Sequence, residues 1–402
     1  MGSLAAPSVP RSLRDETCGV VVRSAPVTTV GREPGVDRSW SARIERHVAV
    51  AGALATLGTH QVRDLVGAAP VLGIGIGGTH RSVHVGGVPV FVKQVLLTDL
   101  ERRPEHLRST ANLFGLPLGC HYGVGSPSFG AWRELAANLL TTGWVEAGRS
   151  EAFPLLHHWR VLDGGGPASA GPSGDELADV EGMVARWHGS AAVRRRVEAI
   201  AASTATVNLF VEHLPFDLPT WLAAQLAAGP EALAAAVDLV ERDLRREVAA
   251  MNGAGLFHFD AHLGNILTDG HRLYLADLGL ATSPGFDLAP AERRFLAANV
   301  SHDAAHTMTR LVDWLVTHVA GEADWRERDR RIARVAAGEP LGPVGPPAVA
   351  AVITRYAAVA AEVNELYRRL HLESRATPYP AAAVERACAA AGLTISWTAD
   401  RA

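Results

Sequence analysis

The sequence predicts an α+β protein of two lobes, one built on an antiparallel sheet and one mainly helical. Its 402 residues exceed one ordinary domain. Short alternating segments separated by glycine pairs fill residues 70–95, which is typical of a strand meander. Residues 212–402 mostly show apolar residues at helical spacing. These observations together predict a sheet followed by a helical lobe.

Composition excludes several classes of function. A formal charge of −4 argues against a protein that binds nucleic acid or an anionic membrane surface through basic residues. The three cysteines, Cys18, Cys120 and Cys388, are too widely spaced for a disulfide framework or a CxxC metal site. No apolar stretch reaches the roughly 20 residues of a membrane span, and the N-terminus lacks the apolar core of a signal peptide. The expected location is the cytoplasm.

The first 211 residues divide into three expected parts. Residues 1–40 are rich in Pro, Ser, Gly, Thr and Arg and are predicted to be a mobile tail. Residues 41–69 have helical spacing and are predicted to be a helical extension. Residues 70–211 form the expected sheet lobe. Its expected strands are 70–76, 81–85, 88–95, 153–162 and 206–212, and its expected helices are 98–113, 129–145 and 175–200, the last in an insertion at 163–200.

The helical lobe is expected over residues 212–402. Only residues 255–281 interrupt its helical pattern with short extended segments. The expected helices are 219–226, 231–251, 290–320, 324–336, 347–371 and 381–391. The interruption is therefore the place where polar side chains could be held outside helices.

The interruption contains the most informative polar residues, His258, Asp260, His262 and Asn265, with Asp277 twelve residues further on. Phosphoryl transfer needs one carboxylate that orients the attacking hydroxyl and accepts its proton, and Mg²⁺ needs a second carboxylate and an amide oxygen. Asp260 suits the first role, and Asn265 and Asp277 suit the second. The alternative is a histidine-rich hairpin whose Asp and Asn only make turns. Five positions at fixed spacing favour a catalytic loop.

This spacing resembles the catalytic loop of the protein-kinase-like superfamily, and it is closest to the aminoglycoside and small-molecule phosphotransferase branch. The resemblance covers about residues 70–320. It implies a two-lobed kinase-like fold with catalytic loop 258–265 in the helical lobe. It also implies an ATP-dependent enzyme in which Asp260 is the base, His258 is among the catalytic residues, and Asn265 and Asp277 hold Mg²⁺.

The resemblance also requires a lysine on the third strand, in contact with the α- and β-phosphates. Lys93 is the single lysine among 38 Lys and Arg residues, and it lies on the third expected strand. Compositional drift toward arginine explains why lysine is rare, but it does not explain why one lysine remains at this place. Because ammonium and guanidinium groups are not interchangeable, Lys93 is expected to bind the nucleotide and to act in catalysis.

A glycine pattern precedes the lysine strand. Gly73, Gly75 and Gly78 satisfy G-x-G-x-x-G at the first expected hairpin. A strand follows the pattern where the dinucleotide fingerprint has a helix, so the dinucleotide reading is disfavoured. The resemblance implies that the backbone amides of this loop cover the phosphates of the nucleotide.

A glutamate that pairs with Lys93 completes the expected nucleotide site. Glu134 is the first choice because it lies on the helix just before the fourth expected strand. Glu101 and Glu105, on the preceding expected helix, are alternatives. The sequence leaves this pairing open.

The segment that begins at residue 210 resembles the hinge between the lobes of a kinase. Backbone groups of Glu212 and Leu214 would bind the adenine, which makes residue identity a weak guide. An ordinary strand-to-helix loop is the alternative. Further along, His302 and Asp303 open an expected helix, where Asp303 either braces the catalytic loop or adds charge at a helix N-terminus.

The acceptor is inferred from departures from regulated protein kinases. Phe259 stands where those kinases have an arginine, His262 stands where they usually have lysine, and the segment after Asp277 is too short for a long activation loop. The expected acceptor is thus the alcohol group of a small molecule such as an amino-sugar or an antibiotic. The alternatives are a Ser/Thr protein or peptide kinase and a pseudokinase that only binds nucleotide. The expected partners are the nucleotide and a small-molecule or peptide acceptor, without nucleic acid or membrane.

Overall fold

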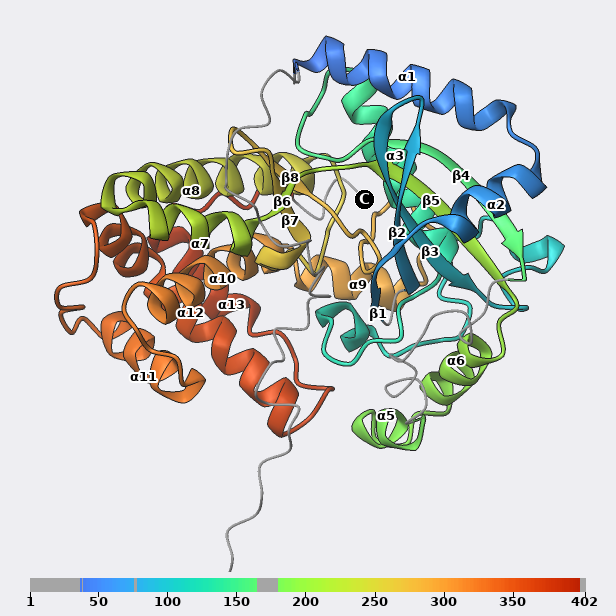
Figure 1. Ribbon diagram of the computed structural model, residues 1–402. Helices are drawn as coiled ribbons and strands as arrows, with labels where there is room; N and C mark the ends of the chain where they lie inside the picture. Colours follow the sequence, from blue (N-terminus) through green and yellow to red (C-terminus); the bar gives the residue numbers. More distant parts are fainter. Residues whose placement is uncertain (1–36, 38, 76–77, 165–179, 398–402) are drawn as a thin grey trace, which may run out of the picture.

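The computed structural model describes residues 37, 39–75, 78–164 and 180–397. Nearly all of the expected tail, residues 76–77 and part of the expected insertion lie outside the described residues. The described chain begins with two helices, α1 (Trp40–Thr56) and α2 (Thr59–Ala68), where a helical extension was expected. Figure 1 shows both in blue along one side of the sheet.

A five-stranded sheet follows, in the spatial order β1-β2-β3-β5-β4. Every neighbouring pair is antiparallel, and the glycine turns predicted this for β1, β2 and β3. Strand β3 is central and pairs with β2 and β5, so a residue on β3 is held from both sides. The strands are β1 (Val71–Gly75), β2 (Gly78–Val85), β3 (Val88–Leu97), β4 (Leu156–Asp163) and β5 (Ala205–Glu212).

Different helices cover the two faces of this sheet. Val90 and Val92 belong to a buried cluster with residues of α1 and α2. Because successive side chains of a strand point to opposite faces, Lys93 points away from α1 and α2. Helix α3 (Ala131–Glu146) covers that opposite face, where its Trp132 packs in one cluster with Leu97. The alternation of β3 therefore directs the single lysine toward α3.

The helix expected at residues 98–113 does not form. This stretch is irregular and contains one short 3₁₀ turn, η2 (Pro104–His106). Proline lacks the N–H that a helix interior requires, and Arg108 has a φ of 60°, which is incompatible with a right-handed helix. The prediction of a helix over residues 98–113 is thus wrong.

Two other expected helices are each divided in two. The stretch 175–200 contains α5 (Val180–Arg186) and α6 (Ala191–Ala201), separated at His188, whose φ is 53°. The stretch 290–320 contains α9 (Pro290–Ala298) and α10 (His302–His318). Between them, the Asn299 side chain donates to the Phe295 carbonyl at 2.7 Å and ends α9. Local side-chain bonds, which compete with helix continuation, explain this second break.

The remainder of the described chain is helical apart from a small sheet of order β6-β7-β8. We call residues 37–212 the sheet region and residues 216–397 the helical region, and Figure 1 shows them on opposite sides of the molecule. The further elements are β6 (Phe216–Asp217), α7 (Leu218–Ala228), α8 (Pro230–Gly253), η5 (Leu263–Asn265), β7 (Ile266–Thr268), β8 (Leu273–Leu275), α11 (Trp325–Ala336), α12 (Pro347–Leu372) and α13 (Ala381–Ala390).

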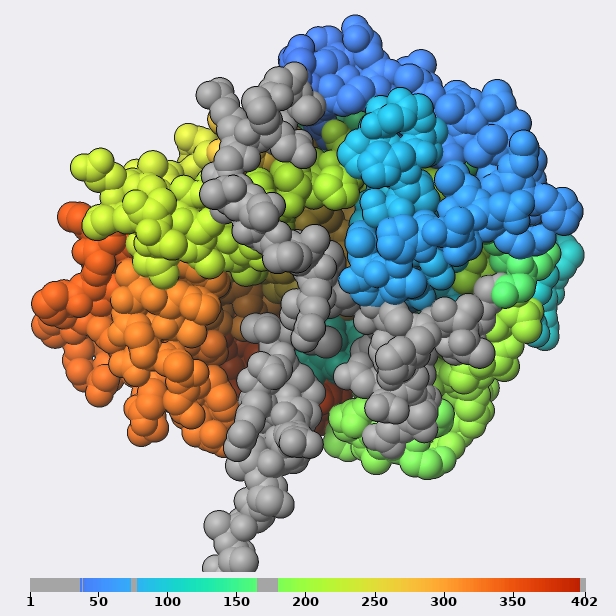
Figure 2. Space-filling view, in the orientation of Figure 1, coloured from blue at the N-terminus to red at the C-terminus, as the bar shows by residue number. Residues whose placement is uncertain are grey.

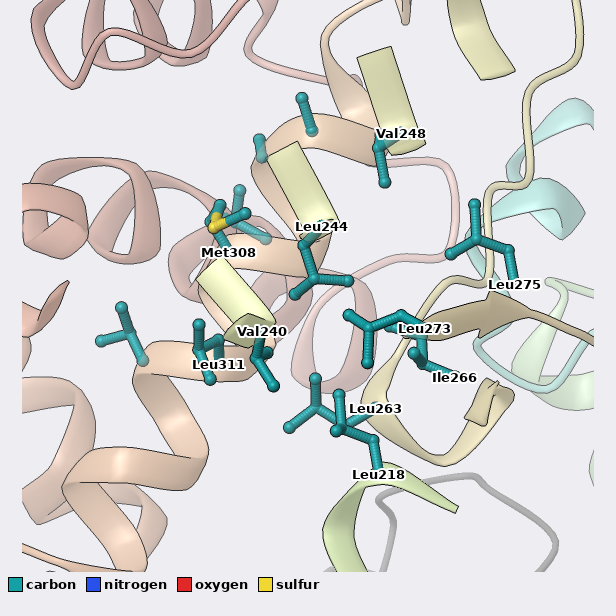
Figure 3. Close-up of a cluster of buried hydrophobic side chains, with 14 of the residues drawn as sticks. Leu218, Val240, Leu244, Val248, Leu263, Ile266, Leu273, Leu275, Met308 and Leu311 are labelled. Atoms are coloured by element: carbon teal, nitrogen blue, oxygen red, sulfur yellow. The ribbon is translucent and has the colours of Figure 1, made fainter. Parts of the chain in front are cut away.

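A cluster of buried apolar side chains fixes the small sheet against the helices. Figure 3 shows Ile266, Leu273 and Leu275 of the small sheet on one side of this cluster and Leu244 of α8 on the other. Each buried Leu or Ile stabilises the fold by about 1.5–3 kcal/mol. The segment between the expected metal ligands Asn265 and Asp277 is therefore built on a rigid base.

The outer surface separates the earliest and latest helices of the chain. Figure 2 shows the blue α1 and α2 at one end of the molecule and orange C-terminal helices at the other. Among the described residues, no helix has both the length and the apolar character needed to cross a membrane.

Candidate active site

Lys93 meets two carboxylates from different parts of the chain. Its Nζ lies 2.7 Å from Glu134 Oε1 and 2.7 Å from Asp277 Oδ1. Glu134 comes from the first turn of α3 and Asp277 from the helical region, just after β8. The Lys93 residue is only 6% exposed, so its ammonium depends on these carboxylates for compensation of its charge. Three segments that are distant in sequence thus converge on one lysine.

The structure distinguishes the three candidate glutamates. Glu134 is buried and contacts Lys93. Glu101 instead pairs with Arg196 at 2.9 Å and accepts from the Ala131 N–H at 2.8 Å. Glu105 lies in η2, which contains no buried residue. The glutamate beside Lys93 is therefore the first choice of the sequence analysis, and Glu101 caps the helix that carries it.

Asp260 and Asn265 are joined within the candidate catalytic loop. The Asn265 Nδ2 donates to the Asp260 carbonyl at 2.9 Å and to Asp260 Oδ2 at 3.2 Å. These two bonds use the amide nitrogen of Asn265 and do not involve its amide oxygen. Asn265 also pairs with the strand that leads to Asp277, because the Ala276 N–H donates to its carbonyl at 2.9 Å. The loop therefore brings Asp260, Asn265 and Asp277 to one place.

His258 is buried at the start of the candidate catalytic loop, and its ring contacts the protein on both sides. It is 0% exposed, and both ring nitrogens are used inside the loop. Nε2 lies 2.9 Å from the Ala276 carbonyl, so it carries the proton, and Nδ1 accepts from the Asp260 N–H at 3.3 Å. His258 was expected among the catalytic residues; its two ring contacts hold it within the protein, and a catalytic role stays a prediction.

Asp303 anchors the same loop from α10. Its carboxylate accepts from the backbone N–H of His258 at 2.7 Å and of Phe259 at 2.8 Å. It also accepts from Asn252 Nδ2 at 2.8 Å. Phe259 has a φ of 62°, a region that a bulky residue rarely adopts. The bonds bear out the brace, and Asp303 also lies in the first turn of α10, as the other alternative expected.

Asp277 also has an unusual backbone conformation, with a φ of 57°. Its Oδ1 accepts from Lys93 and from the Gly279 N–H at 3.3 Å. A Cβ on Gly279 would lie 3.2 Å from Asp277 Oδ1 and 3.3 Å from Glu134 Oε2, which is tighter than an ordinary contact. The glycine therefore lets Asp277 and Glu134 approach the same lysine.

The charges of this group shift one another's pKa values. Desolvation raises the pKa of Asp260 to about 7, and the neighbouring Asp277 carboxylate adds to the rise. Desolvation alone would also raise the pKa of Asp277, but the charge and hydrogen bond of Lys93 outweigh it and hold that pKa well below its usual range. Burial by itself lowers the pKa of Lys93, but the two carboxylates hold it above its usual value. Asp277 thus carries charge at neutral pH, while Asp260 is poised between protonation states.

The oxygen donors present fit a cation that is shared with phosphates. Mg²⁺ is commonly bound by one or two protein oxygens together with phosphates and water. Asp277 supplies a carboxylate, and Asn265 supplies an amide oxygen whose partner nitrogen is already engaged. No group of three or more His, Cys, Asp or Glu side chains among the described residues could hold a metal alone. A metal at this place would therefore need ligands from outside the protein.

The glycine pattern lies at the tip of the β1–β2 hairpin. Gly73 pairs with His80 and Gly75 with Gly78, while residues 76–77 lie outside the described residues. A Cβ on Gly78 would lie 1.8 Å from the Gln94 carbonyl oxygen, and its φ is 130°. Close packing on β3 therefore requires a glycine at Gly78. Contact of this loop with phosphates stays a prediction.

The expected hinge has a contact that the sequence did not reveal. Glu212 ends β5, and its carboxylate binds the buried Arg43 of α1, with Oε2 2.6 Å from Nη2. The Glu212 N–H donates to the Leu155 carbonyl at 2.8 Å. The Glu212 carbonyl group and the backbone of Leu214 stay the predicted adenine contacts.

His80 and Gly123 are site residues that sequence reasoning missed. His80 lies directly opposite Lys93 on β2, so both side chains share one face of the sheet. It is 5% exposed, and burial together with the Lys93 charge lowers its pKa to about 4. A Cβ on Gly123, whose φ is 77°, would lie 2.9 Å from Asp260 Oδ1. Register with the lysine strand could have identified His80, whereas no local signal marks Gly123.

Comparison with known proteins gives a partial relationship. The chain is 35% identical over 178 residues to the hydroxyurea phosphotransferase of Kitasatospora aureofaciens, a match that covers 39% of this chain and 49% of the relative. The chain thus aligns with about half of the relative's length. No protein-family model matches the sequence. The finding is a similarity over part of the chain to a phosphotransferase.

Proposed function

We propose that this protein is an ATP-dependent phosphotransferase that moves the γ-phosphoryl group to a hydroxyl of a small molecule. The proposal includes a two-lobed, protein-kinase-like arrangement of the sheet and helical regions. One observation carries it, the convergence of Glu134 and Asp277 on Lys93 with both oxygens 2.7 Å from Nζ. This arrangement supplies a fixed ammonium for phosphates beside a carboxylate for a metal.

The chain's own residues would do most of their work by positioning. Lys93 would bind the α- and β-phosphates, and Glu134 would keep its ammonium in place. Gly73, Gly75 and Gly78 would cover the phosphates, and backbone groups of Glu212 and Leu214 would hold the adenine. Mg²⁺ held by Asn265 and Asp277 would neutralise charge on the phosphates.

Asp260 would act as the general base. It would orient the acceptor hydroxyl and take its proton as the new O–P bond forms and the bond between the γ-phosphorus and the bridging oxygen of ADP breaks. A pKa of about 7 suits a group that must accept a proton near neutral pH. The Asn265 side chain, which donates to Asp260 Oδ2, would keep the carboxylate aimed.

Two observations favour a small molecule as the acceptor. The similar protein from Kitasatospora aureofaciens is named for phosphotransfer to hydroxyurea, which is a small molecule. Only residues 278–289 separate Asp277 from α9, so no long activation segment intervenes there. A peptide acceptor is the alternative that the experiment must separate.

A transfer assay with γ-labelled ATP and Mg²⁺ tests the proposal. The acceptor panel contains hydroxyurea, amino-sugar antibiotics and Ser/Thr peptides, and the matched variant is Asp260→Asn. We expect labelled small-molecule product from the wild type and a loss of about 10²–10⁴-fold in the variant. Binding of ADP, measured by calorimetry, should stay within a few-fold.

Different results would overturn different parts of the proposal. Label on peptides alone would contradict the small-molecule acceptor. ADP binding without transfer to any acceptor would support the nucleotide-binding alternative. Full activity of Asp260→Asn would exclude Asp260 as the base.

A further inference from the structure

Arg133, which precedes Glu134 in α3, makes a buried ion pair with the helical region. Its Nη2 lies 2.9 Å from Glu292 Oε1 of α9, and both side chains are at most 5% exposed. Glu292 also accepts from the Ala289 N–H at 3.0 Å, which fixes the first turn of α9. Two consecutive residues of α3 thus contact different partners, because Arg133 binds α9 while Glu134 binds Lys93.

A second connection reinforces the first. Arg133 Nε donates to the Thr110 carbonyl at 2.9 Å. The Thr110 hydroxyl donates to Asp287 Oδ2 at 3.1 Å and accepts from the Asp287 N–H at 2.8 Å. Asp287 and Glu292 both follow the candidate metal ligand Asp277 along the chain. The segment after Asp277 therefore holds the start of α3 through several bonds.

The N-terminus of α3 has its own buried charge. Glu101 accepts from the Ala131 N–H at 2.8 Å, and a carboxylate at this position is stabilised by the helix dipole. Arg196 of α6 compensates Glu101 at 2.9 Å, with both side chains at most 3% exposed. The first turn of α3 is thus linked to α6 through Glu101 and to α9 through Arg133.

We propose that Arg133 and Glu292 are positioning residues that hold α3 where Glu134 meets Lys93. The expected effect on kcat rests on the proposed function. The expected effect on the position of Glu134 beside Lys93 does not. A buried pair that loses one partner leaves an uncompensated charge, so the pair restrains α3 strongly. The helix is therefore fixed in place by the fold, and the nucleotide site needs no separate activating event.

The single lysine makes the geometry directly measurable. An amine-acylating reagent can modify one side chain only, Lys93, besides the chain's α-amino group. The modification of Lys93 is followed by mass spectrometry of its peptide. We expect slow acylation in the wild type and clearly faster acylation in Arg133→Met, Glu292→Gln and Glu134→Gln. An unchanged rate in both Arg133→Met and Glu292→Gln would overturn the inference.

A double-mutant cycle separates positioning from general stability. We expect Arg133→Met to lower kcat by about 10–100-fold in the wild type. In a Glu134→Gln background, the same change should have little further effect on kcat or on acylation, because it acts through Glu134. Additive effects would mean that Arg133 is merely structural and would overturn the inference.

Two further variants serve as controls for poor folding and for unspecific effects on Lys93. Glu292→Gln keeps the size and the hydrogen-bonding oxygen of the side chain, so it remains informative where Arg133→Met folds poorly. Arg328→Met removes a pair with Asp329 (2.9 Å) among the C-terminal helices and should leave Lys93 acylation unchanged. A wild type without transfer activity would contradict the proposed function, while the acylation results would still decide the inference.

Discussion

Lys93 concentrates the chemistry of the site in one ammonium group. Its Nζ is 2.7 Å from both partner oxygens, and the side chain is 8% exposed. A guanidinium is longer and planar, so it would overfill this space and separate Glu134 from Asp277. We expect Lys93→Arg to lower phosphoryl transfer by about 10²-fold or more although the charge is kept. Initial rates at saturating ATP measure this effect.

The surface of the same protein provides a contrast for this substitution. Arg330→Lys exchanges the same two residue types at a pair in α11 where both partners are more than half exposed. We expect wild-type rates from that variant because exposed pairs contribute little. Wild-type turnover by a folded Lys93→Arg would show that the lysine has no special role.

At the residue scale, the sequence indicated site residues that lie close together along the chain and one residue whose type occurs only once. Asp260, Asn265 and Asp277 come close together as their spacing predicts, and Lys93 was identifiable because it is the single lysine. The partner of Arg133 could not be predicted, because Glu292 is 159 residues away and only tertiary packing brings the two together. The same reason hid Gly123 beside Asp260.

The candidate catalytic loop is an element held mainly by one carboxylate. Asp303 accepts from the N–H groups of His258 and Phe259 and is 1% exposed. In Asp303→Ala, these two donors would remain buried without an acceptor, at about 1–3 kcal/mol each. We expect the free energy of unfolding to fall by about 2–5 kcal/mol. Urea denaturation followed by circular dichroism measures this loss.

An exposed aspartate provides the matched control for Asp303. Asp324 also accepts from two backbone N–H groups, those of Arg326 and Glu327, but at the exposed start of α11. We expect Asp324→Ala to cost about 1 kcal/mol, as usual for a helix cap. Equal losses in the two variants would contradict the claim that burial makes Asp303 the anchor.

At the element scale, the sequence predicted strands better than irregular segments. The alternation of 88–95 corresponds to β3, and the glycine pairs correspond to hairpin turns. Residues 98–113 were wrongly predicted as a helix, because Pro104 and the positive φ of Arg108 do not fit one. Side-chain hydrogen bonds hold this irregular segment instead. One example joins Thr110 to Asp287, which is 177 residues further along the chain. Such tertiary bonds leave no periodic signal.

At the scale of the whole molecule, α1 connects parts that the sequence treats separately. Arg43 is 2% exposed and contacts Glu212 at the end of β5, the Phe153 carbonyl at 2.9 Å and the ring of Tyr274 in the helical region. The helical extension was predicted, but its role as a link between the expected hinge and the helical region was not. The strand-like and helical patterns along the sequence predicted both regions. The contacts between the regions follow only from the three-dimensional packing.

Buried histidines of the sheet region predict how the stability of the molecule depends on pH. Burial lowers the pKa of His80 to about 4 and the pKa values of His121 and His157 to about 3. In the unfolded chain these histidines have the ordinary pKa of about 6.5, so they bind protons when the pH falls below that value. Between that pH and the lowered values, the unfolded state holds more protons, so acid favours unfolding. We expect the free energy of unfolding to fall steadily as the pH drops from about 6.5 to 4.

The position and the slope of this loss distinguish the histidines from a carboxylate of lowered pKa. Asp260, whose pKa is raised to about 7, acts in the opposite sense over the same pH range and offsets about one histidine. Asp277, whose pKa is lowered, stabilises the fold above its unfolded pKa, so its contribution is lost only near and below pH 4. Each fully buried neutral histidine contributes a slope of about 1 kcal/mol per pH unit below pH 6.5. Replacing His121 with Gln removes one such group and should make the curve shallower between pH 6.5 and 5, as urea titrations at successive pH values would measure. A curve that stays flat down to pH 5, or one that His121→Gln leaves unchanged, would contradict the neutral burial of these rings.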